Sequence, residues 1–550
     1  MSQRPIGIAA GLVLLALVAV VSAVALGVGG GPTPSASPSA RPSTAAASSD
    51  RPAATPALPP GGGATPAPTP SAAPATPGPI GDVAIVPVTN FRSTATSTTR
   101  REVTDVLNGS SGRYATLELV EGEADAVLAA LGIDRPADAR RLVLAPDRAT
   151  LATDLAAHRD RLAFLRADAV APDVRALGWG DRELFGVERV RDLGDWPLVA
   201  QLPAAPSGTA FDPAETWTLF AGGDIMLDRG VYETLRVKGK GPDFPFDGGT
   251  AEITGRCKDC SPLGWDTPYT RRTGNAGAFR DLIKGADIAI ANFENPAPDN
   301  FRWHTSKTVF SADPRLIAGL ADAGIDYVSL ANNHIRDFGG TGVLQTIRNV
   351  TDYGIKVSGA GKNLAAARKP AVLEAAGTRV AILGYDTIAG SYHATATKIG
   401  SAPLTRKVVR EDVAAAREAG ADVVIVFPHW GTEYDPTPFE TQKRLAHLVI
   451  DAGADMVIGN HAHWAAAMEL YEGKPIWYAL GNFVFDQTWS EPTMEGITLE
   501  LTFRGTNLVQ VRMRPHIILD KAQPNFLDPA GDGRVVMGQV FSASKGLLPW

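Results

Sequence analysis

From Thr216 onward, short apolar runs alternate with segments of helical periodicity. Short continuous apolar strands separated by helices are typical of α/β domains with buried sheets. We therefore predict an α/β fold class for this part of the chain, with sheets covered by helices. The predicted strands are 219–221, 288–291, 327–330, 380–383, 423–427 and 456–458, and the predicted helices include 278–284, 314–323, 408–419 and 439–452.

The first thirty residues predict an export segment. Arg4 is the only charged residue before an unbroken apolar run from Ile6 to Val28. As a helix this run would be about 35 Å long, enough to cross a bilayer. The small residues at 23–25 offer a cleavage site, so a removed signal peptide is the alternative. The length of the run favours an uncleaved signal-anchor at 1–30, which predicts a single-pass membrane protein with its folded part outside the cytoplasm.

Two further regions separate this anchor from the α/β part. Residues 31–80 are rich in Pro, Ala, Ser and Thr, with almost no charged or large apolar residues, which predicts a disordered, extended linker. Residues 81–212 predict a small α/β domain, with strands at 83–88 and 142–145 and helices at 124–131 and 149–158. This domain carries no clustered ligand set, so its role stays open. The main domain is then 213–550.

The charge balance excludes one class of partner. The formal net charge of the 550 residues is −7, so no basic field exists to collect a nucleic-acid backbone. An anionic substrate is still compatible with this charge, because a bound metal ion can dominate the local field.

Polar residues able to bind a metal follow the predicted strands of the main domain. They are Asp224, Glu294, Asn333, His334, His429, His461 and His463. The carboxyl ends of strands in an α/β sheet converge on one crevice, so these side chains can share a site. Each one alone is explained as well by a turn or a helix cap. His461 and His463 are harder to dismiss, because residues two apart in an extended segment point the same way.

The chemistry of this set suits a particular group of metals. Carboxylate, amide oxygen and imidazole together favour borderline divalent cations such as Mn²⁺, Zn²⁺ or Fe²⁺. We therefore predict a divalent transition metal as the cofactor. The residues are compatible with one tightly bound metal and with two metals, of which the second is weakly bound.

Six ordered sequence blocks lie between Thr216 and Arg514. They are Gly223–Arg229, Asn292–Glu294, Leu330–His334, His429–Tyr434, Gly459–His463 and Tyr478–Asp486. Together they resemble the poly-γ-glutamate capsule-synthesis (CapA) family, within the calcineurin-like metallophosphoesterase superfamily. The resemblance implies a four-layer α/β/β/α metallophosphoesterase-like sandwich with a two-metal site. It covers neither the linker nor the small domain.

The resemblance also implies roles for individual residues. Asp224, Glu294 and His463 would surround one metal, and Glu294, Asn333, His429 and His461 the other. His334 would be the acid that protonates a leaving group. Arg229 and Lys307 match positions where the family carries cations that hold an anionic substrate, although a surface ion pair explains each as well. Met226 departs from the phosphoesterase pattern, which has a histidine there.

Cys257 and Cys260 are the only cysteines, and no second pair exists that would complete a zinc site. Outside the cytoplasm thiols oxidise, so we predict a small loop disulfide.

These observations support one leading function and two alternatives. The leading hypothesis is an extracytoplasmic metal-dependent hydrolase, or an acyl- or phosphoryl-transfer enzyme, in cell-surface polymer metabolism. The first alternative is a catalytically weak, membrane-tethered scaffold that binds an anionic capsule polymer for assembly or export. The second, a plain α/β substrate-binding protein, would not need the metal-binding set. The expected partners are an anionic cell-surface polymer or its precursor, the membrane, and other capsule-synthesis proteins.

Overall fold

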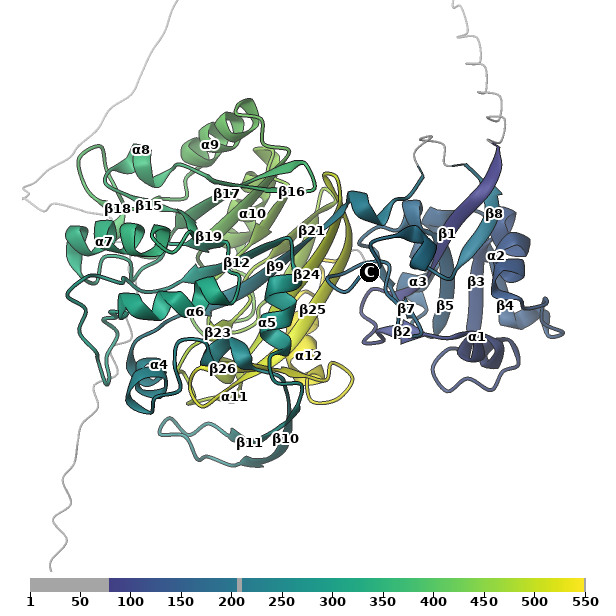
Figure 1. Ribbon diagram of the computed structural model, residues 1–550, viewed down its shortest axis with the longest axis horizontal. Coiled ribbons are helices and arrows are strands. Elements are labelled where there is room, and N and C mark those ends of the chain that lie inside the picture. The colour runs from purple at the N-terminus through teal and green to yellow at the C-terminus, as the bar shows by residue number, and fades with distance from the viewer. Residues whose placement is uncertain (1–78, 205–209, 549–550) are drawn as a thin grey trace, which may run out of the picture. The chain divides into compact units, whose positions relative to one another are not determined.

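The computed structural model describes residues 79–204 and 210–548 (Figure 1). The predicted anchor at 1–30 and nearly all of the predicted linker lie outside these residues. None of the helices in the described ranges combines the length and the apolar character that a membrane span requires.

Residues 79–204 form a sheet with the strand order β4-β3-β5-β1-β6, and β8 pairs with the N-terminal half of β1. The strands and helices predicted for this region are confirmed. The strands of this sheet are β1 (Ile80–Asn90), β3 (Thr116–Val120), β4 (Leu142–Ala145), β5 (Arg161–Arg166), β6 (Val174–Ala176) and β8 (Val199–Pro203), and the helices are α1 (Arg100–Leu107), α2 (Ala124–Leu131) and α3 (Arg148–Ala157).

The rest of the described chain contains a large mixed sheet with the order β11-β10-β26-β25-β24-β9-β12-β13-β14, and β23 pairs with β9. Its strands are β9 (Thr216–Ile225), β10 (Thr250–Cys257), β11 (Thr267–Gly274), β12 (Ile288–Phe293), β13 (Tyr327–Ser329), β14 (Lys356–Ser358), β23 (Asn482–Val484), β24 (Glu495–Arg504), β25 (Asn507–Leu519) and β26 (Gln523–Leu527). Because β9, β12 and β13 are parallel, their carboxyl ends lie at one edge.

A second sheet has the order β16-β17-β19-β20-β22-β21. Its strands are β16 (Ala371–Ala375), β17 (Thr378–Asp386), β19 (Val423–His429), β20 (Met456–Ile458), β21 (Met468–Tyr471) and β22 (Lys474–Trp477). Strands β17, β19 and β20 are parallel, so the carboxyl ends of β19 and β20 also share an edge. All six predicted strands of the main domain are confirmed, each lying within β9, β12, β17, β19 or β20 or overlapping β13.

The two sheets pack face to face, and helices cover their outer faces (Figure 1). Along β9, Leu219 and Ala221 contribute to the apolar core between the sheets, whereas Phe220 packs against the helices on the other face. This alternation follows from the two-residue period of a strand. Helices α5 (Ala278–Gly285), α6 (Ile317–Asp322) and α7 (Gly339–Thr351) cover the larger sheet, and α9 (Arg406–Glu418) and α10 (Glu440–Asp451) cover the smaller one.

Cys257 and Cys260 form a disulfide at the tip of the β10–β11 hairpin, as predicted. The long antiparallel pair β24 and β25 was not predicted, because its buried polar residues interrupt the apolar pattern. Glu500 and Arg512, for example, are buried at 1% and 5% exposure.

Candidate metal centre

The carboxyl ends of strands from both sheets bring five buried ionisable side chains together. Glu294, His429 and His461 form one group, and Asp224, Glu294 and His463 form another. Within each group, one potential ligand atom per residue lies within 4.8 Å of the others. Glu294 belongs to both groups and follows β12 directly, so it lies where a carboxylate could bridge two cations.

Asn333 joins the first of these groups. The Nε2 atom of His429 lies 2.7 Å from Oδ1 of Asn333, 3.0 Å from Nδ1 of His461 and 3.4 Å from Oε1 of Glu294. The structure therefore places all six ligands predicted from the sequence around two adjoining points. Their assignment as ligands is a proposal, taken up below.

The backbone that carries these residues is held in unusual conformations. His461 and His463 have φ values of 93° and 56°, in the left-handed region that non-glycine residues rarely adopt. Such strain is concentrated at functional sites, where the surrounding structure enforces it. Gly223, just before Asp224, is also required: a Cβ atom there would lie 1.9 Å from the carbonyl oxygen of Gly481.

Glu294 decides whether a cation fits. Both of its carboxylate oxygens are buried, and neither has a hydrogen-bond partner among the described residues. Burial, with the charge of Asp224 nearby, raises the pKa of Glu294 well above its ordinary value, and burial raises the pKa of Asp224 to about 7. Burial also lowers the pKa of His463 to about 3, so this imidazole is neutral. The bare carboxylate of Glu294, the buried carboxylate of Asp224 and neutral imidazoles together form a donor set that fits a divalent transition metal.

Two asparagines that the sequence did not single out orient the ligands. The amide nitrogen of Asn482 donates to Gln487 and Thr493, so its Oδ1 accepts from Nδ1 of His463 at 2.9 Å. That hydrogen bond leaves Nε2 of His463 facing Glu294, with 3.8 Å between Nε2 and Oε1. Outer hydrogen bonds of this kind fix the tautomer of a metal-binding histidine.

Asn292 is the second of these asparagines. Its amide nitrogen donates to Oδ1 of Asp224 at 2.7 Å and lies 3.2 Å from Nδ1 of His429. Asn292 and Asn482 both fall inside the six sequence blocks, and that was the only signal that could have identified them.

His334 lies beside the ligand set, with its own carboxylate partner. Its Nδ1 atom is 3.0 Å from Oδ2 of Asp337, and its Nε2 atom is 3.2 Å from the amide nitrogen of Asn333. Asp337 is fixed in turn by the backbone N–H of Phe310 and the hydroxyl of Tyr392. The sequence did not single out Asp337, because an aspartate in a turn usually serves the hydrogen bonding of the turn itself.

The two predicted cations have different environments. Arg229 is ion-paired with Asp486, and its guanidinium lies 4.8 Å from the ring centre of Phe310. Its Nη1 atom also donates to the backbone carbonyl of Lys307. The side chain of Lys307 is exposed and forms no ion pair with any residue in the described ranges. Arg229 therefore supports the loop, whereas Lys307 has an exposed side chain without an ion-pair partner in the part of the chain that the structure describes.

Met226 is completely buried, and its sulfur accepts a hydrogen bond from the backbone N–H of Asp228 at 3.0 Å. It packs in the core between the larger sheet and its helices. The group around Asp224 thus offers three candidate ligands, and the group around His429 offers four.

Residues 218–487 match the bacterial capsule synthesis protein family PGA_cap. The chain is also 30% identical over 288 residues to the capsule biosynthesis protein CapA of Bacillus anthracis, a match that covers 50% of this chain and 70% of that protein. The chain belongs to the CapA capsule-synthesis family. The PGA biosynthesis protein CapA of Bacillus subtilis is 32% identical over 213 residues, which is 38% of this chain and 56% of that protein.

Among solved structures, the calcineurin-like phosphoesterase YfkN of Bacillus subtilis matches this CapA-family chain at 13% identity. The match covers 60% of this chain and 97% of the other, with a TM-score of 0.32.

Proposed function

We propose that this CapA-family protein is an extracytoplasmic metal-dependent hydrolase, or a related transfer enzyme of the metallophosphoesterase type, in cell-surface polymer metabolism. The observation that carries the proposal is the bare, buried carboxylate of Glu294, shared by two ligand groups. Burying an isolated carboxylate costs roughly several kcal/mol of folding free energy unless a cation compensates its charge. The names of the relatives make poly-γ-glutamate, or its precursor, the proposed polymer.

In this proposal the two ligand groups hold one or two divalent cations. Asp224, Glu294 and His463 form one site, and Glu294, Asn333, His429 and His461 form the other. A metal bound there supplies a water of lowered pKa and polarises the bond to be broken. Asn482 keeps His463 in the tautomer that presents Nε2, and Asn292 holds the carboxylate of Asp224.

His334 is the proposed proton donor to the leaving group. Asp337 accepts the Nδ1 proton of His334, so Nε2 is the atom that exchanges a proton with the substrate. This atom lies beside the ligand Asn333 and therefore close to the reacting bond. Lys307 is the proposed binding residue for an anionic substrate group, and Arg229 positions the loop that carries it.

The location of the protein is part of the proposal. The apolar run from Ile6 to Val28 would anchor the chain in the cell membrane, and the linker would extend the folded part away from it. The membrane, the anionic polymer and other capsule-synthesis proteins are then the proposed partners.

One experiment separates the hydrolase from the scaffold. The full chain, purified without chelator, is assayed against a phosphomonoester, a phosphodiester and a γ-glutamyl peptide, with and without added Mn²⁺ or Zn²⁺. Metal-dependent turnover of one substrate, lost in EDTA, supports the hydrolase. Binding of poly-γ-glutamate without turnover of any substrate would favour the scaffold, for which the three-ligand group beside the buried Met226 is the supporting observation.

A further inference from the structure

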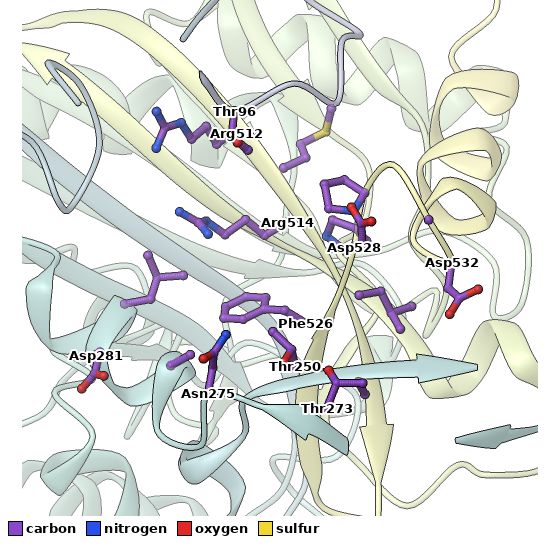
Figure 2. A pocket seen from close by; sticks show the side chains of 18 of the residues that line it. Thr96, Thr250, Thr273, Asn275, Asp281, Arg512, Arg514, Phe526, Asp528 and Asp532 are labelled. Carbon is purple, nitrogen blue, oxygen red and sulfur yellow. Dashed lines mark hydrogen bonds between the residues drawn. The ribbon is translucent and has the colours of Figure 1, made fainter. Parts of the chain in front are cut away.

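A hollow with a volume of about 870 Å³ lies apart from the metal centre. It is lined by strands β25 and β26, by the segment before α5 and by residues of the smaller region, 79–204 (Figure 2). None of the proposed metal ligands belongs to its lining. Its volume falls within the range of small-molecule sites, roughly 300–1,000 Å³.

Three arginines line this cavity, and two of them are neutralised. Arg512 pairs with Glu183 at 2.5 Å and lies 3.6 Å from Glu500. Arg514 donates from Nε to Glu500 at 2.7 Å. The charges of these two side chains are therefore balanced inside the protein.

Arg175 is the exception. Among the described residues it makes one side-chain hydrogen bond, from Nε to the carbonyl oxygen of Ala95 at 2.8 Å, and no ion pair. Burial, with the charges of Arg512 and Arg514 nearby, lowers the pKa of Arg175 to about 10. A partly buried guanidinium that forms no ion pair of its own is costly. Its two terminal nitrogens match the two oxygens of a carboxylate.

The cavity also carries an excess of negative charge. Asp281, Asp528, Asp532 and Glu188 line it, and none of the four pairs with a Lys, Arg or His in the described ranges. Figure 2 shows Asp528 and Asp532 on the side opposite the guanidinium groups of Arg512 and Arg514. A polyanion would be repelled by these carboxylates, so the site does not suit the polymer proposed for the metal centre. An ammonium group, by contrast, would be attracted to them.

We infer that this cavity binds an amino acid or a short peptide as a zwitterion, with its carboxylate on Arg175 and its ammonium group near the unpaired acids. Apolar lining from Phe526, Leu282 and Val187 gives the remainder of such a ligand a surface to pack on. The inference is independent of the activity of the metal centre.

Calorimetry on the full chain tests this binding site. The probes are glycine, L-glutamate and the dipeptide dialanine, each compared with its N-acetyl derivative, which keeps the carboxylate and loses the ammonium charge. We expect at least one zwitterion to bind and its N-acetyl form to bind about tenfold or more weakly. Binding of N-acetyl forms equal to that of the zwitterions would overturn the inference, as would the absence of binding by every zwitterion.

Two variants locate the binding. Arg175→Gln should weaken binding of the zwitterion by about tenfold or more, because the carboxylate loses its bidentate partner. Asp281→Asn changes an exposed side chain at the start of α5, so it leaves the core intact and should weaken binding less. Unfolding curves and metal content verify that both variants are folded. Unchanged affinity in folded Arg175→Gln refutes the site.

Discussion

The two folded regions of this chain place polar residues after their strands for different purposes. In residues 79–204, Asp147 follows β4 and caps helix α3, accepting the backbone N–H of Thr150 at 2.8 Å. In the larger region, Glu294 follows β12, and no described residue donates a hydrogen bond to it. The same local pattern thus has two outcomes. One side chain completes a helix terminus, and the other is left bare at a point where five more proposed ligands converge.

The difference shows what distinguishes a cap from a ligand. A cap forms its hydrogen bond with its own segment, so its acceptor is satisfied locally. A ligand is held away from such donors by its neighbours. Asn292 holds Asp224 and Asn482 holds His463, while the two oxygens of Glu294 have no hydrogen-bond partner in the described ranges.

Replacing Glu294 by Gln should have the largest effect. Because Glu294 is shared by both groups, we expect metal content to fall at least about tenfold, given that even outer partners of a ligand change affinity 10–100-fold. In EDTA the variant should unfold at a higher temperature than the metal-free wild type, since a bare buried carboxylate has been removed. Elemental analysis and thermal unfolding provide the two measurements. Metal content equal to that of the wild type would disprove the assignment.

Replacing His334 by Ala tests chemistry separately from metal binding. We expect metal content to be retained and turnover to fall by roughly 10²–10⁴-fold, as for loss of a general acid. Asp337→Asn should lower turnover without changing metal content, because the hydrogen bonds of Asp337 are to His334, Phe310 and Tyr392 and not to a proposed ligand. If His334→Ala releases the metal, His334 is a ligand and its proposed role as the proton donor is wrong.

The next prediction concerns Met226 and the metal affinities of the two ligand groups. With three ligands against four, we expect calorimetric titration of the metal-free protein to give one tight and one weak site. Met226→Leu conserves volume, so it should cost less than about 1.5 kcal/mol of unfolding free energy and leave both affinities unchanged. Two equally tight sites in the wild type would contradict the difference between the groups.

Asp147→Ala is the matched control in the smaller region and should have the smallest effect. Loss of the cap on α3 should lower the unfolding free energy by about 1 kcal/mol. Metal content should stay at the wild-type value. A fall in metal content would show that the two regions do not use their strand-end residues for separate purposes.

The sequence by itself determined the alternation of strands and helices. The apolar runs at 219–221 and 423–427 lie within β9 and β19, because residues buried on both faces of a sheet must be apolar whatever surrounds them. It also determined which residue types occur at the strand ends and that Cys257 pairs with Cys260. These properties depend on short segments, so a local pattern is enough to reveal them.

Only the tertiary structure decided which polar residues meet and what each one does. Strands β24 and β25 could not be predicted from apolar runs, because Glu500 and Arg512 interrupt them. These charged residues can be buried there because packing provides each with an oppositely charged partner. Arg229 and Lys307 look alike in the sequence. Within the described ranges, however, Arg229 is paired with the carboxylate of Asp486, 257 residues further along the chain, and Lys307 is paired with none. The unpaired oxygens of Glu294 likewise depend on what several distant segments leave uncovered. Such properties are fixed by packing and by the partners that packing brings near, and no local pattern contains them.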